Sequence, residues 1–448
     1  MSEVPDKTNI TDYYYSGFKL FEDSLNGQLK TKVHQLRNEA IKDFSRLGFP
    51  AVSNEEWKYT NIKPILKVNF KPAQLADKTT GMFPAINSNT VKLFLIPELK
   101  VNLIVFVNGV YNSELSNIPS ELTGIKIESL ADILKGGSDF ITEKIIPESK
   151  INDGFAALNK AFTSDGAIVT VADNAVIDEP VHLMFLSGSD SENLLVQPHN
   201  YIFAGRNSRV KIIESFHSIS ENANLINSLS EIFIEENARI THYKIQNDSA
   251  DSGQVNRTQV YQQRSSVFTS FAITFDGALV RNDIYTVFQG EGGESHLYGL
   301  YLANGKSHID NHTMIDHAAA RCQSNEFYKG ILDDHARGVF NGKVMVRRDA
   351  QKTLAYQSNK NLLLSKFARV DTKPQLEIFA DDVKCSHGAT VGQLNDESVF
   401  YLRSRGIGAD MARSILINAF ASDIIDQIDI EPLREYLNNK ILDKLNKV

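Results

Sequence analysis

Short strand-like segments recur through the middle of this 448-residue chain at intervals close to 30 residues. Small residues open these segments, and successive members of the series are separated by 33, 30, 28, 27, 27 and 30 residues. The members are Ala175, Ser208, Ala238, Ser266, Gly293, Ala320 and Ala350. A period of this length, held over six steps, predicts a repeat architecture in which neighbouring repeats stack and share one core.

A second series of small residues, Ala278, Gly305 and Ala336, falls between members of the first and indicates two strands per repeat. We therefore expect a mainly β fold with a right-handed parallel β-helix, or β-solenoid, as its core. Successive turns should stack about 4.8 Å apart. Ladders of small and polar residues at the turns would explain the frequent Asn and Ser.

Both ends of the chain have a different periodicity. Apolar spacing predicts helix over about 17–46, and the segment 54–62 holds the single tryptophan, Trp57, which we interpret as a packing anchor. Helical spacing returns after about residue 395. The expected organisation is an N-terminal helical and mixed region over 1–155, a β-helix core over 156–394 and a helical docking region over 395–448. Open solenoid edges favour capping or pairing with another chain.

The formal net charge is −8, and no basic run is long enough to follow a phosphate backbone, so we expect no nucleic-acid partner. The first residues lack the basic and apolar pattern of a secretory signal. Apolar runs such as 103–107 are far shorter than the roughly 18 residues that a membrane span needs. These features predict a soluble, cytoplasmic protein without a membrane partner.

Cys322 and Cys385 are the only cysteines, which is too few for a disulfide framework. His387 lies two positions after Cys385, so on a strand both side chains would share one face and could reach one metal ion. An iron–sulfur cluster takes about four ligands, mainly thiolates. This chain alone is therefore expected to hold no stable metal site. A Cys/His hydrolase is the less favoured interpretation, because side chains at i and i+2 run parallel rather than converge.

Two further segments are candidates for a site. His308, Asp310 and His312 would share one strand face and could bind zinc or iron, or could equally form a polar interface. The segment 299–307 (GLYLANGKS) resembles a phosphate-binding loop, but five residues separate its glycines instead of four and its interior is bulky. We expect no nucleotide hydrolysis from it.

Three segments together carry a family likeness. The segments 380–392 (ADDVKCSHGATVG) and 399–407 (VFYLRSRGI) resemble the C-terminal signature of the SufB/SufD family of iron–sulfur cluster assembly subunits, and 56–61 (EWKYTN) resembles its N-terminal motif. The SufB branch carries Gln-Cys-Asp-Ser where this chain reads QSNK at 357–360, and His-Glu-Ala-Thr where it reads HGAT at 387–390. The chain therefore resembles the SufD branch.

The resemblance implies a noncatalytic scaffold within a SufB–SufC–SufD complex. Such a subunit pairs with a SufB-like paralogue through its β-helix, and its C-terminal helices receive a SufC-like ATPase. A transient iron–sulfur cluster would form at the shared interface, with His387 as the matching histidine and Cys385 as its less certain neighbour. A reduced flavin could act at the level of the complex, and the isolated chain could form a homodimer.

The alternative function is a β-helical carbohydrate-active enzyme, a lyase or hydrolase. Its nearest acidic pair is Asp381 with Asp382. Adjacent strand residues point to opposite faces, which makes this pair a poor catalytic arrangement.

Overall fold

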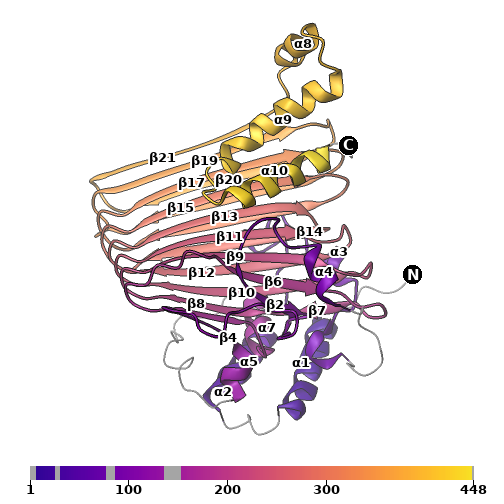
Figure 1. The fold of residues 1–448 in the computed structure, drawn as a ribbon, viewed down its shortest axis with the longest axis vertical. Helices are drawn as coiled ribbons and strands as arrows, with labels where there is room; N and C mark the ends of the chain where they lie inside the picture. Colours follow the sequence, from indigo (N-terminus) through magenta and orange to yellow (C-terminus); the bar gives the residue numbers. More distant parts are fainter. Residues whose placement is uncertain (1–6, 26–30, 77–85, 136–152, 446–448) are drawn as a thin grey trace.

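The computed structural model describes residues 7–25, 31–76, 86–135 and 153–445. Stacked parallel strands form an elongated body, with helices at its N-terminal end and a helix that protrudes beyond the opposite end (Figure 1). This confirms the β-solenoid flanked by N- and C-terminal helices.

Consecutive strands of the solenoid alternate between two sheets, so that each turn contributes one strand to each sheet. We call them sheet A and sheet B. Sheet A contains, in spatial order, β20 (Arg369–Ile378), β18 (Arg337–Val346), β16 (His308–His317), β14 (Leu279–Phe288), β12 (Gly253–Gln262), β10 (Asn224–Ile234), β8 (His199–Ala204), β5 (Ala167–Val171) and β4 (Ile125–Ser129), with β1 (Lys71–Pro72) and β7 (Leu194–Val196) beside this path. Sheet B contains β21 (Val383–Gly392), β19 (Thr353–Leu363), β17 (Gln323–Leu332), β15 (Glu294–Ala303), β13 (Val267–Asp276), β11 (Arg239–Asn247), β9 (Arg209–Ser218), β6 (Val181–Ser187), β2 (Asn102–Val107) and β3 (Val110–Tyr111).

Small residues, buried or partly buried, precede the strands of both sheets, as the repeat analysis predicts. In sheet B, Ser208, Ala238, Ser266 and Gly293 each stand immediately before a strand, and Cys322 and Thr353 occupy the next two places in this column. The predicted anchors Ala320 and Ala350 are therefore displaced by two and three residues. The turn between β15 and β16 (304–307) is two residues longer than the one between β13 and β14 (277–278), and the turn before β19 is longer again. In sheet A, Ser307 rather than Gly305 continues the column of Ala278 and Ala336.

The turns on one side of the solenoid contain a ladder of residues in the left-handed conformation. Asn174, Asn207 and Asn237 have φ of 63°, 55° and 58°. The Asn207 amide donates to Asn174 Oδ1 at 2.9 Å, and the Asn237 amide donates to Asn207 Oδ1 at 3.1 Å. Asparagine tolerates this conformation better than most residues. These contacts confirm the expected polar turn ladders.

The space between the two sheets, which we call the lumen, is filled by both apolar and polar side chains. Phe185, Phe216 and Ile212 belong to its apolar cluster. An asparagine column links Asn256, Asn282 and Asn311 on successive strands through hydrogen bonds of 3.0 and 3.2 Å. The lumen is therefore a packed core that also has its own polar columns.

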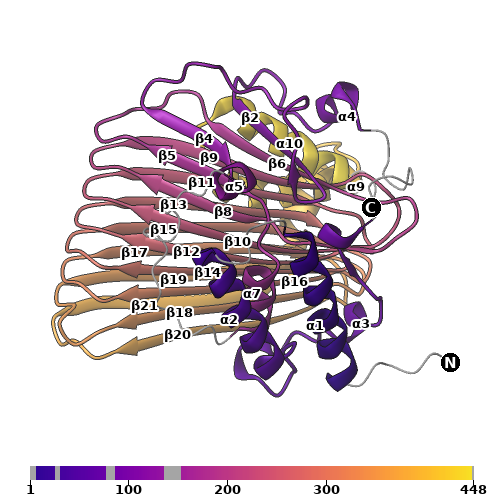
Figure 2. The same cartoon turned by 90° about the horizontal axis from the view of Figure 1, so that it is seen from below.

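Helices α1 (Lys7–Ser24) and α2 (Lys32–Leu47), rather than one continuous helix, form the N-terminal helical region together with α7 (Gly154–Ala161). They cover the outer face of sheet A, as Figure 2 shows. Phe18, Phe44 and Phe155 are buried there against Leu225 and Val255 of the sheet. Short elements complete the region: the 3-10 helices η2 (Glu55–Trp57) and η3 (Ala73–Leu75), and the helices α3 (Lys63–Leu66), α4 (Ser88–Lys92) and α5 (Leu130–Lys135).

The C-terminal helices are α8 (Asp396–Ser404), α9 (Ala409–Ile425) and α10 (Glu431–Leu445). Asn395 caps α8, since its side chain accepts from the Ser398 amide. The second half of α9 and α10 pack on the outer face of sheet B, where Leu437 and Ile441 are buried in one cluster with sheet residues. Within the tail, α8 alone has no buried residue.

Candidate functional site

The solenoid ends in two strands with free edges. Among the described residues, β20 pairs only with β18 and β21 pairs only with β19. Each strand is ten residues long, and an unpaired edge of that length offers a row of backbone donors and acceptors to another strand. This end of the molecule can therefore extend its sheets by intermolecular pairing.

Cys385 and His387 lie on β21, in register with Ala355 and Gln357 of β19. Cys385 is a free, half-buried cysteine that packs with the luminal cluster of Val344 and Val346. Since alternate strand residues share a face, His387 is on the same luminal face. The structure thus brings the two predicted site residues together, at the mouth of the lumen.

The two side chains differ in exposure and in chemistry. Burial raises the pKa of the Cys385 thiol, with the Ala355 backbone acting in the opposite direction, so the free thiol is protonated at neutral pH. Only a deprotonated sulfur ligates a metal well. His387 is exposed, and Gly388 after it has open space around its α-carbon. His387 is therefore the more accessible of the two donors.

Large apolar side chains are exposed around these last turns. Tyr356 of β19, Phe379 after β20 and Val391 of β21 have exposed fractions of 48%, 62% and 49%. Exposed apolar residues beside an unpaired strand edge are typical of an interaction surface.

His308, Asp310 and His312 lie together on the outer face of β16, where the segment around Trp57 covers them. Thr60 Oγ1 donates to Asp310 Oδ2 and lies 2.9 Å from His308 Nε2. His312 Nε2 is 2.9 Å from Asp310 Oδ1, and its Nδ1 is 3.5 Å from Glu56. All three residues thus contact Thr60 or Glu56 and hold the N-terminal segment on the sheet.

Arg281 completes this contact. It donates to Asp310 at 2.9 Å and to the Glu56 carbonyl at 2.7 Å, and its guanidinium lies over the Trp57 ring. Burial opposes ionisation of Asp310, but His312 and Arg281 hold its pKa well below the usual range. In the part of the chain that the structure describes, no group of three or more His, Cys, Asp or Glu side chains is placed to hold a metal ion.

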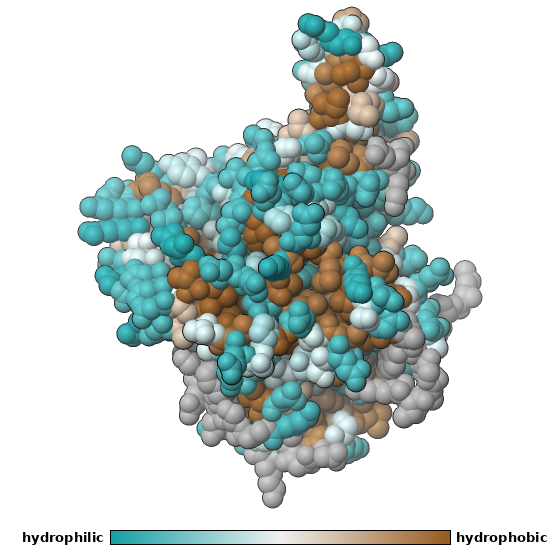
Figure 3. Space-filling model, in the orientation of Figure 1, coloured by the Kyte–Doolittle hydropathy of each residue, from teal (hydrophilic) through white to brown (hydrophobic). Residues whose placement is uncertain are grey.

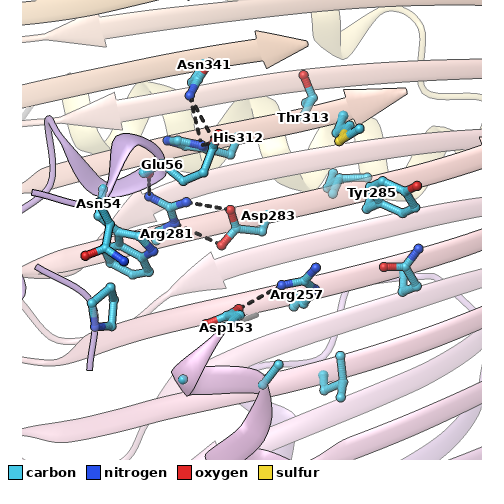
Figure 4. Close-up of a pocket in the computed structure, with 18 of the residues that line it drawn as sticks. Asn54, Glu56, Asp153, Arg257, Arg281, Asp283, Tyr285, His312, Thr313 and Asn341 are labelled. Carbon is cyan, nitrogen blue, oxygen red and sulfur yellow. Dashed lines mark hydrogen bonds and ion pairs between the residues drawn. The ribbon is translucent and has the colours of Figure 1, made fainter. Parts of the chain in front are cut away.

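A cavity of about 760 Å³ lies between this N-terminal segment and the outer face of sheet A (Figure 4). Arg257 and Asp283 project into it, and Arg257 is paired with Asp153 at 2.9 Å. The cavity lining contains both cations and carboxylates, and several of them are already paired, as in Lys160–Glu231, Arg257–Asp153 and Arg281–Asp283.

The remaining sequence candidates have structural roles. Cys322 is fully buried in the small-residue column, and burial raises the pKa of its thiol to about 11. The segment 299–307 consists of strand β15 and the turn after it, with Gly305 at φ 60°, so it forms no phosphate-binding loop. Asp381 and Asp382 are exposed in the bend before β21.

Helix α8 presents an exposed apolar surface (Figure 3). Phe400 is 72% exposed and Tyr401 57%, and Met411 at the start of α9 is 60% exposed. No helix in the described ranges is long and apolar enough to cross a membrane.

The sequence analysis missed two luminal residues close to His387. Gln357 is in register with His387 on one side and with Glu326 on the other, and both Gln357 and Glu326 are buried. Their spacing was a usable signal, because residues about one repeat apart fall in one column.

Two family models together span most of the chain. The model described as the SufBD core domain of SUF-system iron–sulfur cluster assembly matches residues 185–420, and the one described as the SufBD protein N-terminal region matches 8–183. The chain belongs to the SufB/SufD family of iron–sulfur cluster assembly proteins.

Individual relatives agree with this assignment. The chain is 34% identical over 406 residues to an iron–sulfur cluster assembly SufBD family protein of Synechocystis, covering 89% of this chain and 88% of the relative. It is 27% identical to the iron–sulfur cluster assembly protein SufD of Escherichia coli, covering 99% of both chains. It is 26% identical to the chloroplastic protein ABCI7 of Arabidopsis thaliana, covering 94% of this chain and 88% of that one.

Proposed function

We propose that this chain is a noncatalytic, SufD-like scaffold subunit that pairs with a SufB-like paralogue through the free edges of β20 and β21 at the end of the β-helix. The observation that carries the proposal is the unpaired edge of β21, which bears Cys385 and His387 and is flanked by exposed apolar residues. Pairing there would continue both sheets into the partner and would bury the flanking side chains.

A transient iron–sulfur cluster at this junction is the cargo of the complex in our proposal. Cys385 and His387 supply at most two ligands, so the other ligands must come from the partner. No cofactor is stably bound by this chain alone in the proposal, and a reduced flavin would act at the level of the complex. The exposed surface of α8 would receive a SufC-like ATPase. In our proposal the complex works in the cytoplasm. Without the paralogue, the free strand edges could pair with a second copy of this chain.

Backbone hydrogen exchange tests the pairing directly. Addition of a SufB-like partner should slow exchange at the amides of β20 and β21, which gain hydrogen-bond partners, while amides of β15 in the middle of sheet B serve as the internal control. Copurification from the native source should recover a SufB-like chain and a SufC-like ATPase. Recovery of neither, with unchanged exchange at β21, would refute the proposal.

A further inference from the structure

A polar column runs from the interior of the lumen to His387. Glu326 on β17 is in register with Gln357 on β19, which is in register with His387 on β21. Glu326 and Gln357 are both almost completely buried, and His387 is exposed because the solenoid ends there. The column thus joins a buried carboxylate to the exposed imidazole through one amide.

The Glu326 carboxylate is held from both sheets. Thr313 of sheet A donates to one of its oxygens, and Gln357 Nε2 donates to the other at 3.2 Å. The nitrogen of the Gln357 amide is therefore hydrogen-bonded to Glu326 on β17. The oxygen of the same amide remains available to a donor on β21.

Gln357 Oε1 is buried and has no hydrogen-bond partner among the described residues. A buried oxygen without a partner is destabilising, so a donor within reach of it gains a hydrogen bond at no cost to another contact. The site is also shaped for this side chain, since a β-carbon on the facing Gly342 of sheet A would overlap the Gln357 amide. The amide is thus held in position with an acceptor to spare, one strand from His387.

We propose that Gln357 is a positioning residue for His387. In this arrangement Gln357 Oε1 accepts a hydrogen bond from an imidazole N–H, while Glu326 accepts one from Gln357 Nε2. This contact would fix one tautomer of the neutral ring and would leave the other ring nitrogen, with its lone pair, facing the interface. Binding of a cluster atom by that lone pair rests on the proposed function. The positioning itself needs no partner chain, because a turn of the exposed imidazole towards the adjacent, unpaired Oε1 is enough to make the contact.

The test is the tautomer ratio of His387 in the isolated protein, read from ring ¹⁵N shifts of histidine-labelled chain at a pH where the ring is neutral. The signals are assigned by their loss in His387→Ala. We expect one tautomer to predominate in the wild type, and Gln357→Leu to lower the tautomer ratio about fivefold, the ratio that one net hydrogen bond of ordinary strength supports. Ser386→Ala, on the opposite face of the same strand, is the matched control and should leave the ratio unchanged.

A swap variant separates positioning from packing. In the double variant Glu326→Gln/Gln357→Glu, the new carboxylate at position 357 accepts from the amide at position 326 and from the His387 imidazole. The tautomer ratio of His387 should therefore return to the wild-type value. An unchanged ratio in a folded Gln357→Leu chain, or a swap that fails to restore it, would overturn the inference. Cluster yield on the complex with a SufB-like partner is measured in parallel: if Gln357→Leu shifts the ratio while His387→Ala leaves the yield unchanged, the proposed function fails and the positioning stands.

Discussion

The guanidinium of Arg281 lies over the indole ring of Trp57, 3.9 Å from the ring centroid. Arg281 is in the middle of sheet A, whereas Trp57 precedes the solenoid in the chain, so this contact joins the N-terminal region to the repeat core. The tryptophan is therefore a packing anchor, as the sequence suggested.

Trp57→Ala should lower the stability of the protein, because it removes a buried ring that also stacks on Phe155. The expected loss is about 3–5 kcal/mol, measured from the urea unfolding midpoint. Lys67→Ala, at an exposed position near the same segment, should change stability by less than about 0.5 kcal/mol. Equal midpoints for Trp57→Ala and the wild type would contradict the anchor role.

Glu326 should make stability depend on pH. Burial raises the pKa of its carboxyl to about 7, against the opposing hydrogen bonds from Thr313 and Gln357. The native state therefore binds this proton more tightly than the unfolded chain, so stability is highest below about pH 4.5 on this account and falls as pH rises towards 7.

Glu326→Gln should remove this decrease in the free energy of unfolding, which is on the order of 3 kcal/mol across the titration. Unfolding midpoints between pH 5 and 8 measure it. Glu121→Gln, at an exposed position, should retain the wild-type profile. Parallel profiles for Glu326→Gln and the wild type would show that Glu326 is ionised throughout.

The exposed face of α8 should be required for ATPase capture but not for folding. Phe400→Asp should reduce binding of a SufC-like ATPase at least tenfold, as expected for loss of an aromatic interface anchor, with an unchanged melting temperature because the side chain is 72% exposed. Leu93→Asp, at an equally exposed apolar residue near α4, is the matched control and should bind normally. Normal binding by Phe400→Asp would place the ATPase elsewhere.

His387→Ala should leave the complex assembled and lower the yield of reconstituted cluster, because the exposed donor at the end of the solenoid is lost. Iron and acid-labile sulfide per complex measure the yield, and size-exclusion chromatography confirms assembly. Cys385→Ser, measured in the same way, separates the thiol from the imidazole. An unchanged yield for His387→Ala would remove this residue from the mechanism.

Removal of residues 395–448 should destabilise the solenoid itself. The truncation would expose the buried side chains Tyr243, Phe271 and Leu300 of sheet B, which pack against α9 and α10. Such a variant is therefore expected to aggregate or to melt at a lower temperature, and it would not report cleanly on ATPase binding. A soluble truncated chain with the wild-type melting temperature would contradict this expectation.

The sequence predicted the solenoid well because its constraint is periodic. Every turn needs a small buried residue where the chain enters a strand, so Ser208, Ala238 and Ser266 recur at nearly constant spacing. The prediction drifted at Ala320 and Ala350, since turns of variable length change the spacing without changing the column.

Contacts between distant segments were beyond such reasoning. One partner shared by His308 and Asp310, Thr60, lies about 250 residues away in the chain, and no periodicity connects it to them. The placement of Cys385 and His387 on one face was predictable, because the two residues are two positions apart on one strand. The place of Gln357 beneath His387 required the strand register.

Helices α9 and α10 share one buried apolar cluster with sheet B residues that run from Ile213 on β9 to Leu362 on β19. Stacked repeats ordinarily interact only with their neighbours and can unravel one at a time from an end. Two helices that share one apolar cluster with several turns couple the unfolding of those turns, because none of them can open without disrupting the cluster. The turns next to the free edges of β20 and β21 are thereby held by helices that lie on the outer face of sheet B, away from those edges.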